Sequence, residues 1–361
     1  MGQLVDLRPI FNRQKIFITG HTGFKGSWLS MWLTEMGAEV CGYALAPESD
    51  RNLFSLLKMS DRVKDIRGDI RDLSHLKGAI EDFQPKFVFH LAAQALVLKS
   101  YESPVETFDT NVMGSVNLLE ALRSSSSVRS LIYVTSDKCY KNKEWDWGYR
   151  ESDELGGHDP YSASKAAAEI VFSSYASSFL NDKKQLGLAS VRAGNVIGGG
   201  DWSDHRLVPD IVKSIESGNL FEIRNSSSIR PWQHVLEPLG GYLKLAAFLS
   251  QEPQKYFGPW NFGPSFDNFK TVSDLVIGIE KVFSESLSNK IEKRTAAPSS
   301  APKETKVLKL NCDKAMSQLD WKPKWNFDQT VLETAKWYLE YFRGGDLESF
   351  TRKQIANFTG V

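Results

Sequence analysis

The 361-residue sequence predicts an α/β fold, in which a doubly wound parallel sheet is followed by a smaller C-terminal α/β lobe. Three observations support this prediction. Short, nearly continuous apolar runs alternate with longer amphipathic runs over residues 15–198. Apolar runs of this kind are typical of parallel strands that are buried on both faces. From about residue 196 the chain becomes rich in glycine, proline and aromatic residues, which indicates a second lobe.

The first expected elements form a strand–helix–strand unit and its continuation. KIFITG at 15–20 is an apolar run ending at glycine, so it predicts a strand. Apolar residues recur at helical spacing over 26–36, and EVCGYAL at 39–45 predicts the next strand. RVKDIRGD at 62–69 predicts a short third strand, and the amphipathic run DLSHLKGAIEDF at 72–83 predicts a helix.

The same alternation continues to residue 198. KFVFHLAA at 86–93 and RSLIYVTS at 129–136 are apolar and predict strands. Long helical patterns follow them at 104–125 and 160–179, and LGLASVRAGNVIG at 186–198 begins as a strand. Strands that alternate with helices in this way predict βαβ units and therefore a parallel sheet.

Three further segments are expected in the C-terminal part of the chain. Residues 234–249 and 328–342 carry amphipathic helical patterns. Residues 284–306 are polar, so we expect an exposed excursion there.

These elements predict two structural units. Residues 1–195 are expected to form a dinucleotide-binding domain, to which residues 234–262 return. Residues 196–233 and 263–361 are expected to form the lobe that binds the rest of the substrate.

Composition and charge exclude several classes of function. Lys plus Arg and Asp plus Glu both number 44, so there is no basic footprint for nucleic acid. The three cysteines are odd in number and far apart, which indicates a reducing compartment rather than a disulfide framework. No run approaches the roughly 18 apolar residues of a membrane span, and no signal-peptide h-region is present. We expect a cytoplasmic protein without a membrane partner and without a metal, because the six histidines lack paired ligand spacing.

A glycine triplet follows the first expected strand. Gly20, Gly23 and Gly26 are spaced three apart where the strand ends and a helix begins. A helix N-terminus presents unpaired N–H groups and a positive dipole end, and glycines let the backbone approach a pyrophosphate closely. In this context the triplet predicts a Rossmann-type dinucleotide-binding sheet, although its spacing is GxxGxxG rather than GxGxxG.

The residue pattern alone leaves the choice between NAD and NADP open. No acid ends the second strand, where NAD-binding proteins hold the ribose hydroxyls. The first acid after it is Glu48, and Arg51 follows soon after. Asp69 and Ile70 follow the third strand, where they are placed to flank an adenine. Helix N-capping accounts equally well for Asp69 and Asp72.

Tyr161 and Lys165 lie four residues apart in a helical pattern, so they share one face. A phenol normally has a pKa near ~10, which is too high for a base at neutral pH. A neighbouring ammonium group lowers that pKa, so Tyr161 is expected to take a proton from a sugar hydroxyl. Ser136 ends a predicted strand, where ligands of open parallel sheets bind, and is expected to hydrogen-bond the same hydroxyl.

The stretches TGHTGFKGSWLSMWL, TSDKCY, YSASK and RAGNVIGGGDW together resemble the extended, nucleotide-sugar branch of the short-chain dehydrogenase/reductase superfamily. Within that branch they closely resemble the CDP-glucose 4,6-dehydratase family, over nearly the whole chain. The resemblance implies bound NAD and CDP-D-glucose as substrate. Hydride leaves C4 for the nicotinamide, water is lost across C5–C6, and the hydride returns to C6. The implied product is CDP-4-keto-6-deoxy-D-glucose, a precursor in deoxysugar and lipopolysaccharide biosynthesis.

The resemblance also implies roles for individual residues. Asp137 stands where these dehydratases place the acid that protonates the departing C6 hydroxyl, although a strand-end cap is an alternative. Lys138 stands where related dTDP-sugar dehydratases have the glutamate that removes the C5 proton. It is therefore either a desolvated base or a charge that stabilises the enolate. The implied cofactor residues are Gly20, Thr22, Gly23, Phe24, Lys25, Gly26, Asp69, Ile70, Leu91, Ala92, Ala93, Gln94, Asn111, Tyr161 and Lys165, and the implied substrate residues are Asn195, Arg206, Arg230 and His234.

Three other functions stay open on the sequence. They are a nucleotide-sugar 4-epimerase, a dehydratase for another nucleotide sugar, and a non-catalytic NAD-sensing binding protein. Asp137 and Lys138 argue against the epimerase, which needs no acid for elimination. Because the relatives pair long helices into a four-helix bundle, we expect a homodimer or homotetramer built on residues 104–125 and 160–179.

Overall fold

A computed structural model describes residues 6–180, 185–223, 225–265, 268–286, 293–295 and 308–360. In this part of the chain the largest sheet has seven strands in the order β3-β2-β1-β4-β5-β6-β11. Every neighbouring pair in it is parallel. The strands are β1 Lys15–Thr19, β2 Glu39–Ala44, β3 Lys64–Arg67, β4 Phe87–His90, β5 Ser130–Val134, β6 Gly187–Arg192 and β11 Gly258–Asn261. The predicted doubly wound parallel sheet is confirmed.

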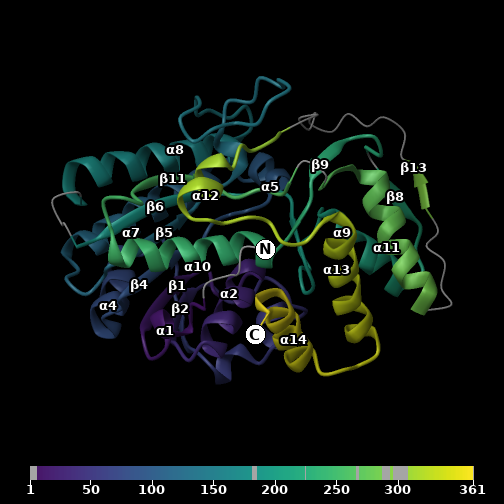
Figure 1. The fold of residues 1–361 in the computed structure, drawn as a ribbon, viewed down its shortest axis with the longest axis horizontal. Helices are drawn as coiled ribbons and strands as arrows, with labels where there is room; N and C mark the ends of the chain where they lie inside the picture. The colour runs from purple at the N-terminus through teal and green to yellow at the C-terminus, as the bar shows by residue number, and fades with distance from the viewer. Residues whose placement is uncertain are drawn as a thin grey trace.

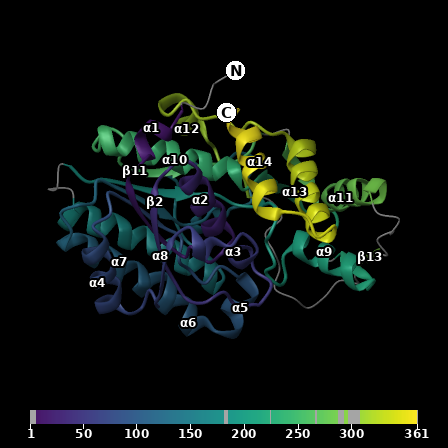
Figure 2. The ribbon, with the colours of Figure 1, turned by 90° about the horizontal axis from the view of Figure 1, so that it is seen from below.

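Two helical layers cover the sheet, one on each face (Figures 1 and 2). On β1, Ile16 and Ile18 pack into one apolar core, and Phe17 between them packs into the other. Successive side chains of a strand point to opposite faces, so a continuous apolar run serves both cores. The first core includes helices α2 Phe24–Glu35 and α10 Leu236–Gln251, and the second includes α4 Leu73–Phe83, α7 Gly114–Ser124 and α8 Pro160–Tyr175.

Several element boundaries differ from the sequence prediction. Helix α2 begins at Phe24 rather than at residue 26, because Gly23 is its extended N-cap residue. The predicted helix 104–125 is divided into α6 Pro104–Phe108, a π-helical turn η2 Asp109–Met113 and α7. In this π-helical turn the Asn111 side chain points into the interior, where it makes buried hydrogen bonds. The predicted helix 160–179 is α8 followed by a second π turn, η4 Ala176–Leu180.

The predicted strand 186–198 is also divided. After β6, Asn195 adopts a left-handed φ of 50°, and the short strand β7 Val196–Ile197 pairs with β10 Gln233–His234 instead of with the large sheet. Helix α10 then returns along the sheet, and β11 pairs with β6.

The C-terminal lobe contains two more two-stranded sheets and several helices. The pairs are β9 with β12 and β8 with β13. Most of the predicted excursion at 284–306 lies outside the described residues. The remaining elements are α1 Arg8–Phe11, α3 Leu53–Leu56, η1 Met59–Asp61, α5 Val97–Glu102, η3 Asp137–Cys139, α9 Leu207–Ser217, β8 Phe221–Ile223, β9 Ile229–Pro231, β12 Phe269–Thr271, α11 Val272–Ser286, β13 Lys293–Thr295, α12 Asp313–Gln318, α13 Phe327–Phe342 and α14 Leu347–Thr359.

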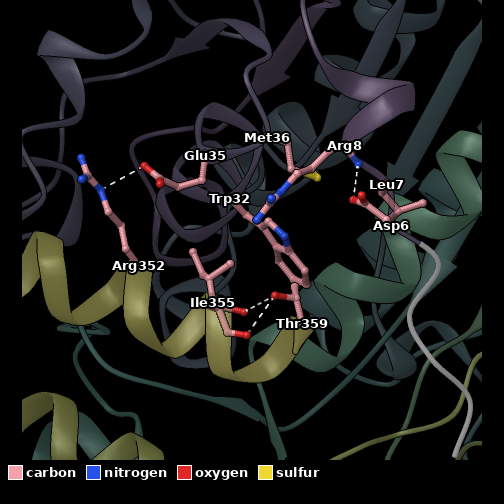
Figure 3. A pocket seen from close by; sticks show the side chains of 10 residues that line it. Asp6, Leu7, Arg8, Trp32, Glu35, Met36, Arg352, Ile355 and Thr359 are labelled. Atoms are coloured by element: carbon pink, nitrogen blue, oxygen red, sulfur yellow. Dashed lines mark hydrogen bonds and ion pairs between the residues drawn. The ribbon is translucent and has the colours of Figure 1, made fainter. Parts of the chain in front are cut away.

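The last helix ties the C-terminal lobe to the first domain (Figure 3). The Trp32 ring on α2 meets Phe358 on α14 edge to face, with centroids 5.8 Å apart, and Arg352 Nε contacts Glu35 Oε1 at 3.0 Å. A cavity of about 100 Å³ remains between α1, α2 and α14. No helix of the described segments combines the length and the apolar character that crossing a membrane requires.

Candidate active site

The glycine turn between β1 and α2 is built for close backbone approach. Gly20 has φ +77°, and a Cβ on it would lie 2.7 Å from the backbone nitrogen of Ala92. A Cβ on Gly26 would lie 2.1 Å from the Gly20 carbonyl oxygen, so α2 packs directly on the turn. Exposed Gly23 caps α2 without a capping side chain, and the first turn of α2 carries no acid. The positive end of α2 is therefore presented to an anion such as a pyrophosphate.

A second group of hydrogen bonds fixes the loop after β4. Ala92 N donates to Thr19 Oγ1 at 3.2 Å, which joins this loop to the end of β1. Gln94 N donates to Asn111 Oδ1 at 2.8 Å, and Asn111 Nδ2 donates to the Gln94 carbonyl at 3.0 Å and to Ser164 Oγ at 2.9 Å. Asn111 thus locks the Leu91–Gln94 loop to helix α8, beside the glycine turn.

The end of β5 carries two of the predicted catalytic residues. Ser136 is extended and caps the short helix η3, because its Oγ accepts a hydrogen bond from Lys138 N at 3.2 Å. The same Oγ donates to Asp137 Oδ1 at 2.9 Å. The Asp137 side chain is almost fully enclosed, with 2% of its surface exposed. Asp137 therefore faces the protein interior rather than bulk solvent.

Helix α8 brings Tyr161 to Ser136. Asp159 caps α8 by accepting a hydrogen bond from Ser162 N at 2.9 Å, and Pro160 occupies its first turn. Tyr161 N donates to Ser100 Oγ at 3.2 Å, so α5 also holds this end of the helix. The Tyr161 phenol lies near enough to Ser136 for the serine hydroxyl to lower the pKa of the phenol.

The acidity of Tyr161 differs from the sequence prediction. Burial raises the pKa of Tyr161 to about 12, and the Ser136 hydrogen bond and the charge of Arg206 oppose that rise. The predicted lowering by a neighbouring ammonium is therefore wrong for the protein alone, because desolvation of the phenolate outweighs the Ser136 hydroxyl and the charge of Arg206.

Lys165 lies one turn after Tyr161 and is also buried. Burial lowers the pKa of Lys165 to about 8, and the positive charge of Lys25 lowers it further, whereas Glu169 raises it. At neutral pH most Lys165 side chains still carry their charge, because that pKa lies above 7.

Three cations and two carboxylates meet around the mouth of the glycine turn. Burial and the charge of Arg206 lower the pKa of Lys25 to about 8, while the charges of Asp137 and Asp201 raise it. Arg206 Nη1 donates to Asp201 Oδ2 at 2.8 Å. With Lys165 the group contains one more cation than carboxylates, which suits the phosphates of a nucleotide.

A buried ion pair lies behind the predicted catalytic residues. Arg192 Nε donates to Glu169 Oε1 at 2.9 Å and Arg192 Nη2 donates to Glu169 Oε2 at 2.8 Å. Thr135 Oγ1 and Ser190 Oγ also donate to this carboxylate. Burial opposes its charge, but Arg192 outweighs burial, so the pKa of Glu169 is lower than usual. The network connects β5, β6 and α8, the elements that carry Ser136 and Lys165.

Four predicted residues lie elsewhere or make other contacts. Asp69 accepts hydrogen bonds from Arg71, and Ile70 packs against Gly114 in the core beneath α7. Asp72 caps α4 through His75 N, so capping explains this acid. The cofactor-binding roles of Asp69 and Ile70 stay predictions.

The other two lie later in the chain, on β9 and β10. Arg230 lies on β9, and its Nη1 donates to the neighbouring Ile229 carbonyl at 3.0 Å. His234 is fully buried between Trp28 and Trp325, with ring centroids 5.8 and 4.8 Å away. Burial lowers the pKa of His234 to about 3, so the ring is neutral.

Thr22, Phe24 and Asn195 border the site. Thr22 Oγ1 donates to the Leu45 carbonyl at 3.1 Å, at the end of β2. The ring of Phe24 approaches Gly198, beyond β7. Asn195, with its left-handed φ, forms the bend between β6 and β7.

Three members of the site have no role in the sequence prediction. Glu169 lies four residues after Lys165, so helical spacing was a usable signal for it. Asp201 precedes Arg206 within the same loop, which is a weaker signal. Arg192 gives no local signal, because its partners come from other strands and helices. Within the described ranges no three His, Cys, Asp or Glu side chains gather as metal ligands.

Comparisons with known proteins cover the glycine turn, the catalytic group and most of the C-terminal lobe. Residues 17–334 match the family described as GDP-mannose 4,6 dehydratase. A CDP-glucose 4,6-dehydratase from Salmonella typhimurium is 47% identical over 349 residues, 96% of each chain. A dTDP-glucose 4,6-dehydratase structure from Streptomyces venezuelae, with NAD bound, is 21% identical with a TM-score of 0.77, covering 92% of this chain and 98% of that one. A UDP-glucose 4-epimerase structure from Thermus thermophilus, in complex with NAD, is 25% identical with a TM-score of 0.73, covering 91% and 99%.

Proposed function

The chain belongs to the GDP-mannose 4,6-dehydratase family, and we propose that it is a CDP-glucose 4,6-dehydratase. It converts CDP-D-glucose to CDP-4-keto-6-deoxy-D-glucose and water. The 47% identity to the Salmonella typhimurium CDP-glucose 4,6-dehydratase, over 96% of both chains, carries this proposal. The enclosed Asp137 beside Ser136 supports a dehydratase rather than an epimerase, because only the dehydratase has to protonate a leaving hydroxyl.

The glycine turn fits NAD. The uncapped N-terminus of α2, the close approach at Gly20 and the Lys25 ammonium suit a dinucleotide pyrophosphate. The Asn111-fixed loop at 91–94 lies where the nicotinamide half would be held, and Lys165 lies beside it. When bound, NAD supplies the acceptor that takes the C4 hydride and returns it at C6.

The chain's own residues move protons and position the sugar. Ser136 and Tyr161 bind the C4 hydroxyl, and Tyr161 takes its proton as C4 is oxidised. The Ser136 hydroxyl and the positive charge of Arg206 favour the phenolate, against the burial that holds its pKa at about 12. Oxidation at C4 makes the C5 hydrogen acidic, Lys138 takes the C5 proton, and the ammonium charge it then carries stabilises the enolate.

Asp137 completes the elimination. Its carboxyl gives a proton to the C6 hydroxyl, which leaves as water, so the C5–H and C6–O bonds break and a C5–C6 double bond forms. Arg206 holds the substrate diphosphate together with Arg230, and Asn195 contacts the sugar. His234 packs between Trp28 and Trp325, and its part in substrate binding stays a prediction.

One experiment separates the candidate reactions. The protein is incubated with NAD and with CDP-, dTDP-, GDP- or UDP-glucose carrying deuterium at C4. We expect turnover of the CDP sugar and deuterium at C6 of a keto sugar. A C4-epimerised product without loss of water would refute the dehydratase, and preferred turnover of another nucleotide would refute the CDP specificity.

A homodimer or homotetramer built on α6–α7 and α8 is part of the proposal. These helices lie side by side and expose large apolar residues: Val105 is 80%, Ile170 60%, Met113 49%, Phe179 46% and Phe108 39% exposed. Apolar groups that gather in this way favour a subunit interface. Ile170→Lys should shift the sedimentation coefficient to that of a monomer, whereas Ile277→Lys, at a similarly exposed position on α11, should not. A monomeric wild-type protein would contradict the proposal.

The remaining parts of the proposal concern organisation and location. Residues 1–195 with 234–262 form the cofactor domain, and residues 196–233 and 263–361 form the substrate lobe. Pairing of β11 with β6 supports this division. The three cysteines are buried free thiols, which supports a cytoplasmic location.

A further inference from the structure

Gly194 lies directly against the Asp137 carboxyl group. Both residues follow neighbouring strands, Asp137 after β5 and Gly194 after β6, and Thr135 N donates to the Val191 carbonyl at 2.9 Å between them. A Cβ on Gly194 would lie 1.8 Å from Asp137 Oδ2, 2.2 Å from Cγ and 2.5 Å from Oδ1. The whole carboxyl group therefore occupies the space that a side chain at position 194 would take.

The backbone conformation does not explain this glycine. The φ angle of Gly194 lies outside the left-handed region, whereas the next residue, Asn195, has φ +50° without being glycine. The backbone is also held in place, because Gln233 Nε2 donates to the Gly194 carbonyl at 3.0 Å and to the Phe262 carbonyl at 3.1 Å. A side chain at position 194 would therefore clash with Asp137, because the hydrogen-bonded backbone cannot shift away from it.

Two more groups border the carboxyl group. Ser136 Oγ donates to Oδ1, and the buried Tyr242 phenol on α10 lies within electrostatic reach of Asp137. A carboxyl group pushed away by a new methyl group would lose the Ser136 hydrogen bond. Its direction is thus set from two sides, by the Ser136 hydroxyl and by the missing side chain of Gly194.

We propose that Gly194 is a positioning residue for the elimination step, because the space left by its missing side chain directs the Asp137 carboxyl toward the C6 hydroxyl. This inference rests on the proposed dehydratase function. Gly194 acts on the elimination through Asp137, whereas oxidation at C4 uses Tyr161 and Ser136. The two steps should therefore respond differently to a methyl group at position 194.

The test follows both steps in one turnover. Holoenzyme with bound NAD is mixed rapidly with CDP-glucose, and NADH absorbance and 4-keto-6-deoxy product are recorded. In Gly194→Ala we expect NADH to form within a few-fold of the wild-type rate and then persist, while product formation slows about 10²-fold. The same substitution at Gly263, where a Cβ would have only ordinary contacts at 3.4 Å, should leave both rates unchanged.

A double variant separates positioning from general damage. In an Asp137→Ala background no carboxyl group remains to be displaced, so adding Gly194→Ala should slow product formation no further. If Gly194→Ala alone lowers the melting temperature of the wild-type protein, it should not lower the melting temperature of Asp137→Ala. The inference is overturned if Gly194→Ala forms product at the wild-type rate, or if it slows NADH formation as much as product formation. It is also overturned if Gly194→Ala slows product formation as strongly in the Asp137→Ala background as in the wild-type protein. A wild-type chain that never converts CDP-glucose would instead refute the proposed function.

Discussion

Replacing Arg192 with methionine tests the ion pair behind the catalytic residues. Both members of the pair are 3% exposed, and Arg192 also donates to the Tyr140 hydroxyl at 2.7 Å and to the Glu151 carbonyl at 3.1 Å. Arg192→Met would leave the buried Glu169 carboxylate with the hydroxyls of Thr135 and Ser190 as hydrogen-bond partners and the charge of Lys165 nearby. Breaking a buried pair in this way costs about 3–5 kcal/mol. That is a large share of the roughly 5–15 kcal/mol by which proteins are stable.

The assay is urea unfolding of the single and double variants at several pH values. Arg192→Met should lower the free energy of unfolding by about 4 kcal/mol at pH 7. The loss should shrink as the pH falls, because the unpaired Glu169 then takes up a proton. This sign follows from the wild-type protein, in which the lowered pKa of Glu169 contributes stability that is lost only as pH falls through that pKa.

The matched control removes both charges. Arg192→Met combined with Glu169→Gln should recover at least about 2 kcal/mol relative to Arg192→Met alone, because no buried charge is then left unpaired. A single variant within about 1 kcal/mol of wild type would refute the reasoning. So would a double variant that is no more stable than the single one.

Three further predictions concern the site and its supports. Tyr161→Phe should slow turnover by about 10²–10⁴-fold and leave NAD binding intact, as measured by steady-state kinetics and calorimetric titration; unchanged turnover would contradict its role as base. Gly20→Ala forces a left-handed φ on alanine and a clash with Ala92 N, so NAD affinity should fall at least about tenfold. Gly78→Ala, which meets nothing within 4 Å, is its control, and equal affinities would contradict the prediction. Burial raises the pKa of Glu237 from 4.5 to about 7, so the free energy of unfolding of the wild-type protein should fall by about 3 kcal/mol as the pH rises through this window. In urea unfolding, Glu237→Gln should remove this dependence on pH, and the same dependence in both proteins would contradict the prediction.

Much of the fold was predictable because it depends on local patterns. The apolar runs KIFIT and SLIYV supply both faces of β1 and β5, so they had to be buried strands whatever the rest of the chain did. The glycine turn was equally local, since the residues that allow it are contiguous. The division of the 104–125 helix was not predictable, because the π turn forms around Asn111 and its partners on a loop and on α8.

The sequence predicted part of the candidate site, but it missed Glu169, Asp201 and Arg192 and the electrostatics of the group. Spacing placed Tyr161 and Lys165 on one face, and the strand end placed Ser136 beside them. The pKa of Tyr161 could not be read in the same way, because burial of the phenol by the folded chain raised it to about 12. Residues such as Arg206 and Lys25, distant in sequence, determine how much of that rise is offset.

The sequence by itself determined the alternating sheet, the glycine turn after β1 and the placing of Tyr161 and Lys165 on one helix face, since each of these follows from neighbouring residues. Only the tertiary structure decided that Lys25, Arg206 and Asp201 lie together near the glycine turn and that Glu169 and Arg192 form a buried ion pair. It also decided that the Asp137 carboxyl group packs where a side chain of Gly194 would lie. Charge and steric contact act through distance in space, and distances between remote residues exist only once the chain has folded.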